Sequence, residues 1–159
     1  AQMTHLEGYR HGGYAMKARA RWLDGMAFAS ETGSGHRLTV DGPPDLGGQE
    51  RGPRPMELML QSLGCCSAVD VVYILERGRH PVSDCEVEVE AERAETPPKV
   101  FTAIHLHFRV SGEGLKDAAV ARAVQLSAEK YCSPRPVRSP TATRWWRRVD
   151  AVVSGGGAV

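Results

Sequence analysis

Two stretches in the second half of the chain alternate between apolar and polar residues. In residues 85–91 the polar positions are glutamates, and in residues 104–110 they are two histidines and an arginine. Alternation with a period of two is typical of a strand that is buried on one face. A tight turn at residues 96–99 joins the two stretches. The pattern therefore predicts a hairpin whose histidines face the glutamates on the solvated side.

Residues 16–41 contain shorter strand-like stretches separated by turn signals. Asp24 and Gly25 are typical of a hairpin turn, and a second turn signal lies at residues 32–35. We therefore predict a β-meander. Residues 42–54, which follow, are rich in glycine and proline, and no regular structure is expected there.

The most helix-like segment covers residues 55–77. Pro55 suits the first helical position, Glu57 lies in the first turn, where an acid is favourable, and Gly78 can end the helix. The apolar residues of this segment are so dense that the helix is expected to be nearly enclosed. A second helix is predicted from residue 115 to about residue 131, because apolar residues repeat there at helical spacing.

These elements predict an α+β fold, because no repeated β-α-β unit is visible in their order. The chain contains neither the glycine fingerprint of dinucleotide-binding proteins nor a phosphate-binding loop. Residues 1–15 show no periodicity and are interpreted as a flexible extension. Residues 16–153 are interpreted as a single domain, and residues 154–159 as a flexible tail.

Composition narrows the classes of function. The 159 residues carry a formal net charge of +1, which gives no electrostatic reason to expect nucleic-acid binding. Uninterrupted apolar runs are short, so no membrane span is expected. The first 15 residues are polar and unlike a secretory signal peptide. The four cysteines show no CxxC pair and no zinc-ribbon spacing, which favours a cytoplasmic protein with reduced thiols and without a metal site.

The cysteines are the candidates for chemistry. A reactive cysteine needs a cation, a helix N-terminus or a base that lowers the pKa of its thiol. Cys66 lies about three turns inside the first helix, so the helix dipole is too far away and activation would need a tertiary neighbour. Core packing is the alternative for Cys66, and it is the interpretation of Cys65 and Cys85. Cys132 ends the second helix and could be brought over Cys66 if the two helices pack together.

Several segments resemble the OsmC/Ohr family, and most of all its YhfA-like branch. The motifs are a proline with an acidic residue, then Gly-x-Cys on a long helix, and a second cysteine after an Ala-Glu-Lys-Tyr helix end. They occur in residues 52–79 and 116–133, with further matches at 31–42 and 107–112, so the similarity covers about residues 16–133. The resemblance implies an OsmC-like fold, an intertwined homodimer whose long central helices are wrapped by antiparallel β-sheets.

The resemblance also implies a chemistry. The family's characterised members are thiol-dependent peroxidases that act on organic hydroperoxides. By this resemblance Cys66 would be the peroxidatic cysteine and Cys132 the resolving cysteine. The hydroperoxide would oxidise Cys66 to a sulfenic acid, Cys132 would condense with it to a disulfide, and an external dithiol would reduce the pair. No cofactor is implied.

The chain departs from the family pattern at the residues that activate the thiol. A methionine rather than an acid follows the proline that starts the helix, and Glu57 comes one position later. We therefore keep Glu57, Arg21, His36 and Arg37 as candidate activating residues.

Two other functions stay open. The first is a non-catalytic OsmC-fold protein that binds a small apolar ligand at the dimer interface. The second is a structural or metal-binding role for Cys66, Cys132 and His36.

Residues 133–148 are a further departure from the family pattern, because they contain five arginines, two tryptophans and no acid. We interpret this segment as a divergent terminus rather than a nucleic-acid or membrane contact, with residues 149–153 as a candidate replacement for the family's last strand.

Overall fold

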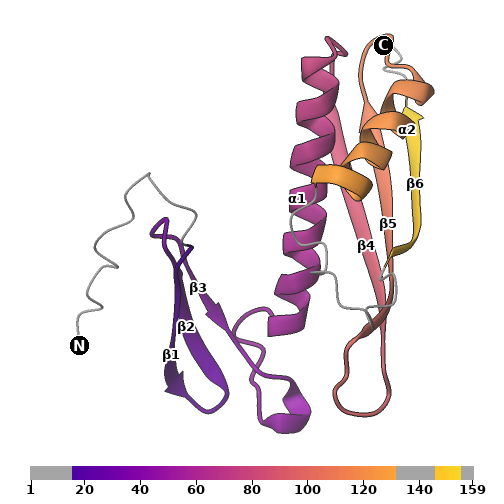
Figure 1. The fold of residues 1–159 in the computed structure, drawn as a ribbon. Helices are drawn as coiled ribbons and strands as arrows, with labels where there is room; N and C mark the ends of the chain where they lie inside the picture. The colour runs from indigo at the N-terminus through magenta and orange to yellow at the C-terminus, as the bar shows by residue number, and fades with distance from the viewer. Residues whose placement is uncertain (1–15, 132–145, 155–159) are drawn as a thin grey trace. The chain divides into compact units, whose positions relative to one another are not determined.

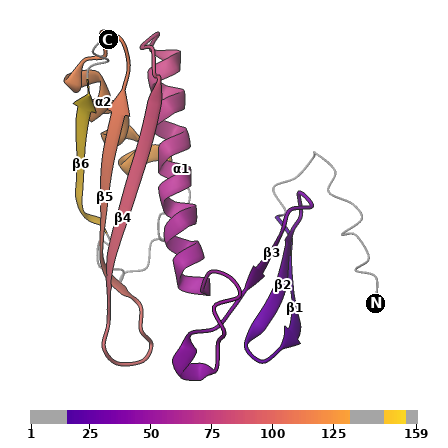
Figure 2. The same ribbon diagram turned by 180° about the vertical axis from the view of Figure 1, so that it is seen from behind.

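The structure, a computed structural model, describes residues 16–131 and 146–154. Its contacts divide the chain into two units, residues 1–58 and residues 59–159, and each is described by itself. The predicted extension and most of the predicted tail lie outside the described residues. The elements, shown in Figures 1 and 2, are β1 (Ala18–Asp24), β2 (Ala27–Thr32), β3 (Arg37–Val40), η1 (Pro44–Leu46), α1 (Pro55–Arg77), β4 (Asp84–Arg93), β5 (Phe101–Ser111), α2 (Asp117–Leu126), η2 (Ser127–Tyr131) and β6 (Trp146–Ser154).

The N-terminal unit contains the predicted meander. Its three strands pair antiparallel in the order β1-β2-β3. Gly25 has a φ of 52° in the turn between β1 and β2, a left-handed conformation that glycine adopts without steric cost. The hairpin predicted from Asp24 and Gly25 is therefore confirmed.

A buried carboxylate organises the loop after β3. Asp41 is 2% exposed, and its side chain accepts backbone N–H hydrogen bonds from Gly42 at 2.8 Å, Gln49 at 2.9 Å and Arg51 at 3.1 Å. These bonds, above all the one from Gln49, hold the pKa of Asp41 below its ordinary value of 3.8. The loop also contains a short 3₁₀ helix at Pro44–Leu46, so the expectation of no regular structure there was wrong.

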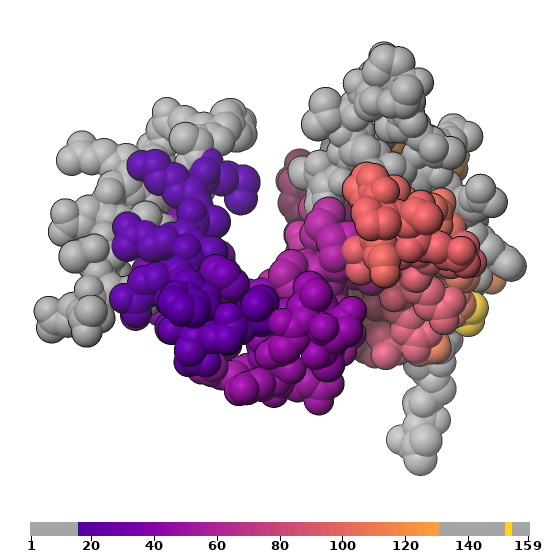
Figure 3. Space-filling view, turned by 90° about the horizontal axis from the view of Figure 1, so that it is seen from below, coloured from indigo at the N-terminus to yellow at the C-terminus, as the bar shows by residue number. Residues whose placement is uncertain are grey.

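In the C-terminal unit, β4 and β5 form the predicted antiparallel hairpin. The register pairs Glu88 with His107, as the alternation predicted. On the same solvated face, the guanidinium of Arg109 donates to Glu86 at 2.8 Å and to Glu88 at 2.9 Å. The connection between the two strands, residues 95–100, is exposed at the end of the hairpin that faces the viewer in Figure 3.

The third strand of this sheet changes the expected topology. β6 pairs with β5 in parallel, so the sheet is mixed rather than antiparallel, and β5, α2 and β6 make a crossover connection. The predicted strand at 149–153 lies within β6, which begins earlier, at Trp146. The second helix is shorter than predicted: α2 covers Asp117–Leu126, and Ser127–Tyr131 form a π-helical turn.

Both helices of this unit cover one face of the sheet (Figures 1 and 2). The core lies between them and β5. Its buried apolar side chains include Leu63, Val71, Leu75, Ile104, Leu106, Phe108, Val110, Val120, Ala123 and Val124.

The predicted bounds of α1 are confirmed, but its last turn closes differently. The N–H of His80 donates to the carbonyl of Leu75 and that of Arg79 to the carbonyl of Glu76, both at 2.9 Å. In this Schellman-type end the left-handed residue is Arg79, with a φ of 59°, and not Gly78. An arginine therefore occupies the position that glycine usually takes.

One side of α1 is uncovered within the described part of this chain. Met59, Val69 and Tyr73 are 50%, 68% and 60% exposed. The nearly complete enclosure predicted for this helix is thus not found within a single chain.

By length and composition alone, α1 meets the criterion for a membrane-crossing helix. The expectation that no segment could do so was too strong, because it considered only uninterrupted apolar runs. Core helices of water-soluble proteins meet the same criterion, so it assigns no membrane role to α1.

Candidate functional site

Cys66 lies in the middle of α1, as predicted. Its side chain is half-buried and its thiol is free. It belongs to the uncovered side of the helix, because Met59 and Tyr73 stand seven residues before and after it and residues seven apart share a helical side.

The end of α2 is fastened to α1 beside Cys66. The hydroxyl of Ser127, a buried residue, donates to Oδ2 of Asp70 at 3.1 Å and lies 3.5 Å from the carbonyl oxygen of Ser67. Ser67 follows Cys66 directly, and Asp70 is one helical turn further on. Sequence analysis missed this contact, although a serine among the apolar positions of the second helix was its visible signal.

Cys132 lies outside the described residues. It follows Ser127 by five positions and comes directly after the π-helical turn Ser127–Tyr131. Ser127, five positions before Cys132, therefore contacts the part of α1 that contains the candidate peroxidatic cysteine.

Glu57 caps the helix. Its Oε2 accepts a hydrogen bond of 2.9 Å from the backbone N–H of Arg54, as the third helical residue does in a capping box. Cys66 is nine positions further along α1, which corresponds to about 13.5 Å along the axis and half a rotation about it. Glu57 cannot touch Cys66 of its own helix, so its predicted activating role would require a partner chain.

The other candidate activating residues belong to the N-terminal unit. The register places Arg21 and Arg37 on one face of the β1-β2-β3 sheet, together with Glu31. Glu31 is 1% exposed, and one of its carboxylate oxygens lies 3.4 Å from Nη2 of Arg37. His36 precedes β3, with its Nδ1 3.0 Å from the hydroxyl oxygen of Ser34. That one of these residues activates Cys66 stays a prediction.

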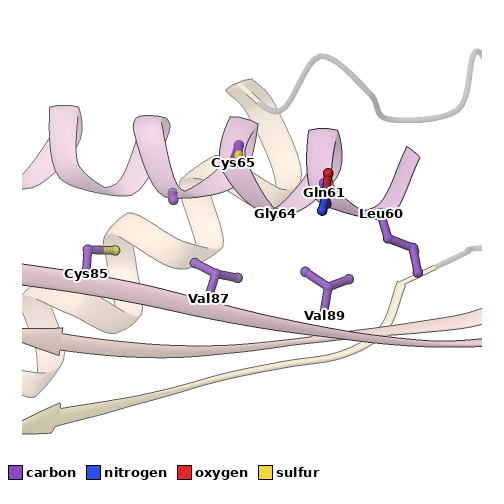
Figure 4. Close-up of a pocket in the computed structure, with 8 residues that line it drawn as sticks. Leu60, Gln61, Gly64, Cys65, Cys85, Val87 and Val89 are labelled. Atoms are coloured by element: carbon purple, nitrogen blue, oxygen red, sulfur yellow. The ribbon is translucent and has the colours of Figure 1, made fainter. Parts of the chain in front are cut away.

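A cleft of about 510 Å³ opens between α1 and β4 in the C-terminal unit (Figure 4). It forms where α1 carries small residues at adjacent turns, Gly64 and Ala68. Gly64 lies so near β4 that a Cβ added to it would be 2.8 Å from Cγ2 of Val89. The complete lining is Leu60, Gln61, Gly64, Cys65, Ala68, Cys85, Val87 and Val89.

The cleft contains the two cysteines that were interpreted as core residues. Cys65 is exposed and Cys85 is half-buried, so neither is enclosed within the described chain. Burial raises the pKa of the Cys85 thiol above its ordinary value, and the neighbouring carboxylate of Asp84 raises it further. Cys85 is therefore a weak nucleophile near neutral pH.

Among the residues that the structure describes, no three histidine, cysteine or acidic side chains are grouped to hold a metal ion. The proposed metal role of Cys66, Cys132 and His36 includes one residue outside this description. It therefore gains no support from the geometry.

Comparison with known proteins identifies the family. The model of the family described as OsmC-like protein matches residues 47–135. Protein YhfA of Escherichia coli strain K12 is 53% identical over 118 residues, which are 74% of this chain and 85% of that protein.

Solved structures share the fold. The crystal structure of a hypothetical protein from Aquifex aeolicus VF5 has a TM-score of 0.76 at 28% identity, covering 91% of this chain and 100% of that one. An organic hydroperoxide resistance protein from Elizabethkingia anophelis has a TM-score of 0.62 at 14% identity, covering 92% of this chain and 100% of that one, a likeness of fold alone. The α+β fold, the matched segment around Cys66 and the close relative agree: this chain belongs to the OsmC-like protein family.

Proposed function

We propose that the protein is a cytoplasmic homodimer that reduces organic hydroperoxides with its own thiols. Cys66 is the peroxidatic cysteine, Cys132 is the resolving cysteine, and an external dithiol is the reductant. Family membership supports this proposal, because the matched residues 47–135 include both cysteines. The Elizabethkingia protein of the same fold is an organic hydroperoxide resistance protein, which supports the substrate class.

The observation that carries the proposal is the contact of Ser127 with Asp70 and Ser67. A resolving cysteine must reach the sulfur of the oxidised cysteine. The hydrogen bond from Ser127 holds the end of α2, which precedes Cys132 in the chain, against the turn of α1 that follows Cys66. Cys132 comes directly after the π-helical turn Ser127–Tyr131, so it is within five residues of this contact.

The proposed catalytic cycle has three steps. The thiolate sulfur of Cys66 attacks the terminal peroxide oxygen, an S–O bond forms, the O–O bond breaks, and the alkoxide takes a proton and leaves as an alcohol. The thiolate of Cys132 then attacks the sulfenic sulfur, an S–S bond forms, the S–O bond breaks, and the hydroxide takes up the proton that the Cys132 thiol released and leaves as water. A dithiol supplies two electrons and two protons by exchange and returns both cysteines to thiols.

Single cysteine variants test the proposal. The full-length protein is mixed with cumene hydroperoxide and dithiothreitol, and peroxide consumption is followed. We expect Cys66→Ser to abolish consumption and Cys65→Ser, the adjacent thiol on another side of the helix, to retain it. Cys132→Ser should leave a sulfenic acid that dimedone traps, with no intramolecular disulfide by mass spectrometry. Wild-type protein that consumes no peroxide, or a fully active Cys66→Ser variant, would refute the proposal.

Ser127→Ala tests the geometric argument separately. The variant keeps both thiols but removes the donor that fastens α2 to α1. We expect sulfenic acid to form at the wild-type rate and the disulfide to form more slowly. An unchanged rate of disulfide formation would show that the contact does not position Cys132.

One observation favours a second candidate function, binding of a small apolar ligand. The cleft between α1 and β4 has the volume of a small-molecule site and is lined mainly by apolar side chains. A fluorescent fatty acid is a suitable probe, and Val87→Phe should weaken its binding by filling the cleft. Equal binding to this variant and to wild type would exclude the cleft as the site.

A further inference from the structure

The proposed reduction of a hydroperoxide requires a proton carrier beside Cys66. The thiol must lose its proton before its sulfur attacks, and the alkoxide that leaves must gain one. Glu57 caps the start of α1. The other predicted activating residues belong to the N-terminal unit and are Arg21, His36 and Arg37. None of the four shares a turn of α1 with Cys66, so the acid–base group of this step is still to be assigned.

Asp70 lies one helical turn after Cys66 on the same side of α1. Side chains four positions apart in a helix are neighbours, with about 5–6 Å between their Cβ atoms. Within residues 62–70, Asp70 is the only residue with a carboxylate or a cationic side chain. The other carboxylates of α1 are remote from Cys66: Glu57 is nine positions before it and Glu76 ten positions after it, about 13.5 Å and 15 Å along the axis.

The carboxylate of Asp70 is held by one oxygen and is accessible to a small molecule. The Ser127 hydroxyl donates to Oδ2 at 3.1 Å, so the other oxygen, Oδ1, can serve the thiol without breaking that bond. Asp70 is half-buried. It lines a hollow of about 540 Å³, whose other lining residues are Tyr73, Ile74, Arg77 and Leu126. The apolar part of this lining suits the organic group of a hydroperoxide.

We propose that Asp70 is a catalytic residue that carries the proton from the Cys66 thiol to the leaving alkoxide. The inference rests on the proposed function and adds the acid–base group of its first step. Oδ1 accepts the thiol proton, the sulfur attacks the terminal peroxide oxygen, an S–O bond forms and the O–O bond breaks. Asp70 then gives the proton to the alkoxide, which leaves as an alcohol. The sulfur has lost two electrons to the peroxide, and Asp70 is again a carboxylate.

A purely electrostatic effect of Asp70 would have the opposite sign. A negative charge disfavours a thiolate one helical turn away. If this were the only effect of Asp70, its removal would make Cys66 react faster with every electrophile. If Asp70 carries the proton, its removal slows only a reaction whose leaving group needs a proton. Electrophiles with different leaving groups therefore distinguish the two roles.

Asp70→Asn tests the proton transfer, because its amide oxygen can still accept the Ser127 hydroxyl but cannot carry the proton. The full-length protein has its other three cysteines replaced by serine, and loss of the Cys66 thiol is followed after rapid mixing. We expect Asp70→Asn to slow oxidation by cumene hydroperoxide by about 100-fold, the lower end of what general acid–base catalysis contributes. The reactions with 3-chloroperoxybenzoic acid and iodoacetamide should not slow, because carboxylate and iodide leave without a proton.

Further variants in the same background are matched controls, and circular dichroism checks that each is folded. Asp70→Glu keeps a carboxylate and should recover much of the lost rate. Asp70→Ser removes the carboxylate in a second way and should repeat the pattern of Asp70→Asn. Ser127→Ala keeps the carboxylate but removes its hydrogen bond, so Cys66 should be oxidised at the unsubstituted rate. Glu76→Gln removes a carboxylate of α1 that is remote from Cys66 and should change none of the rates.

The outcomes separate the inference from the proposed function. A folded Asp70→Asn protein that reacts with cumene hydroperoxide at the unsubstituted rate, or faster, would overturn the role of Asp70 alone. Equal slowing with all three reagents would also overturn it, because Asp70 would then affect the thiol and not the leaving group. A wild-type protein that consumes no peroxide with dithiothreitol would overturn the proposed function, and the role of Asp70 with it.

Discussion

The close approach of Gly64 in α1 to Val89 in β4 gives a test of the packing with a defined sign. Gly64 is buried against Val89, and the Cβ of an alanine at position 64 would lie 2.8 Å from Cγ2 of that valine. Carbon atoms in ordinary contact are about 3.5–4.0 Å apart. The Gly64→Ala variant therefore requires the helix, the strand or the valine side chain to move by about 1 Å.

Two opposing effects set the magnitude. Alanine in a helix interior is favoured over glycine by about 1 kcal/mol. Forcing a methyl group against Val89 costs about 1–3 kcal/mol, because a β-branched valine has few rotamers to which it can move. We expect Gly64→Ala to lower the free energy of unfolding by about 1 kcal/mol, which corresponds to about 2–4 °C in Tm.

Urea unfolding at one fixed protein concentration measures this effect. The matched background is Val89→Ala, which removes the methyl group that the new Cβ would strike. In that background Gly64→Ala should become neutral or stabilising, so the double-mutant cycle should show a coupling of about 1 kcal/mol. A stabilisation of about 1 kcal/mol in the otherwise wild-type protein would refute the reasoning, because only the helix propensity would then act.

Three further predictions follow from single residues. Arg79→Gly should raise the free energy of unfolding in urea by about 1 kcal/mol, because glycine adopts the left-handed conformation at the end of α1 without the arginine's steric cost. Asp41→Asn should lower Tm at pH 7; the folded-state pKa of Asp41 is depressed, so its stabilisation is present above its unfolded pKa and is lost as the pH falls through the folded value. Iodoacetamide at pH 8, followed by peptide mapping, should label Cys65 well before Cys85, because the pKa of Cys85 is raised and its side chain is half-buried.

Each of these predictions has a contrary result. An Arg79→Gly variant that is less stable than wild type would show that the arginine makes contacts worth more than its backbone cost. If the Tm values of wild type and Asp41→Asn differed as much at pH 2 as at pH 7, the ionised carboxylate would not explain the difference. Labelling of Cys85 first would contradict the burial of its thiol.

The hairpin and α1 could be predicted because local physics and tertiary structure agree there. The glutamates of β4 alternate with apolar residues that lie toward α1, and a shift of the register by one residue would place the glutamates on that side instead. Pro55 starts α1 at the position where its missing N–H is harmless. By contrast, Gly78 predicted the end of the helix only approximately, since the left-handed residue is Arg79.

The candidate site was predicted less completely, because it depends on contacts between distant residues. No local pattern shows that Ser127 reaches Asp70, or that Cys65 and Cys85 line one cleft. Glu57 was identified as a residue of the first turn, but its bond to the Arg54 N–H is a capping contact that competes with a catalytic assignment. The parallel pairing of β6 was missed because strand direction leaves no mark in the pattern of apolar residues.

That parallel pairing implies an order in which the sheet assembles. β4 and β5 meet across a short turn, whereas β6 reaches β5 only after α2 has crossed the sheet. Closing the long connection between β5 and β6 costs conformational entropy, and this cost precedes the first β5–β6 hydrogen bond. β6 is thus the last strand to join and the first to leave, and in native-state hydrogen exchange its amides should open at a lower free energy than those shared by β4 and β5.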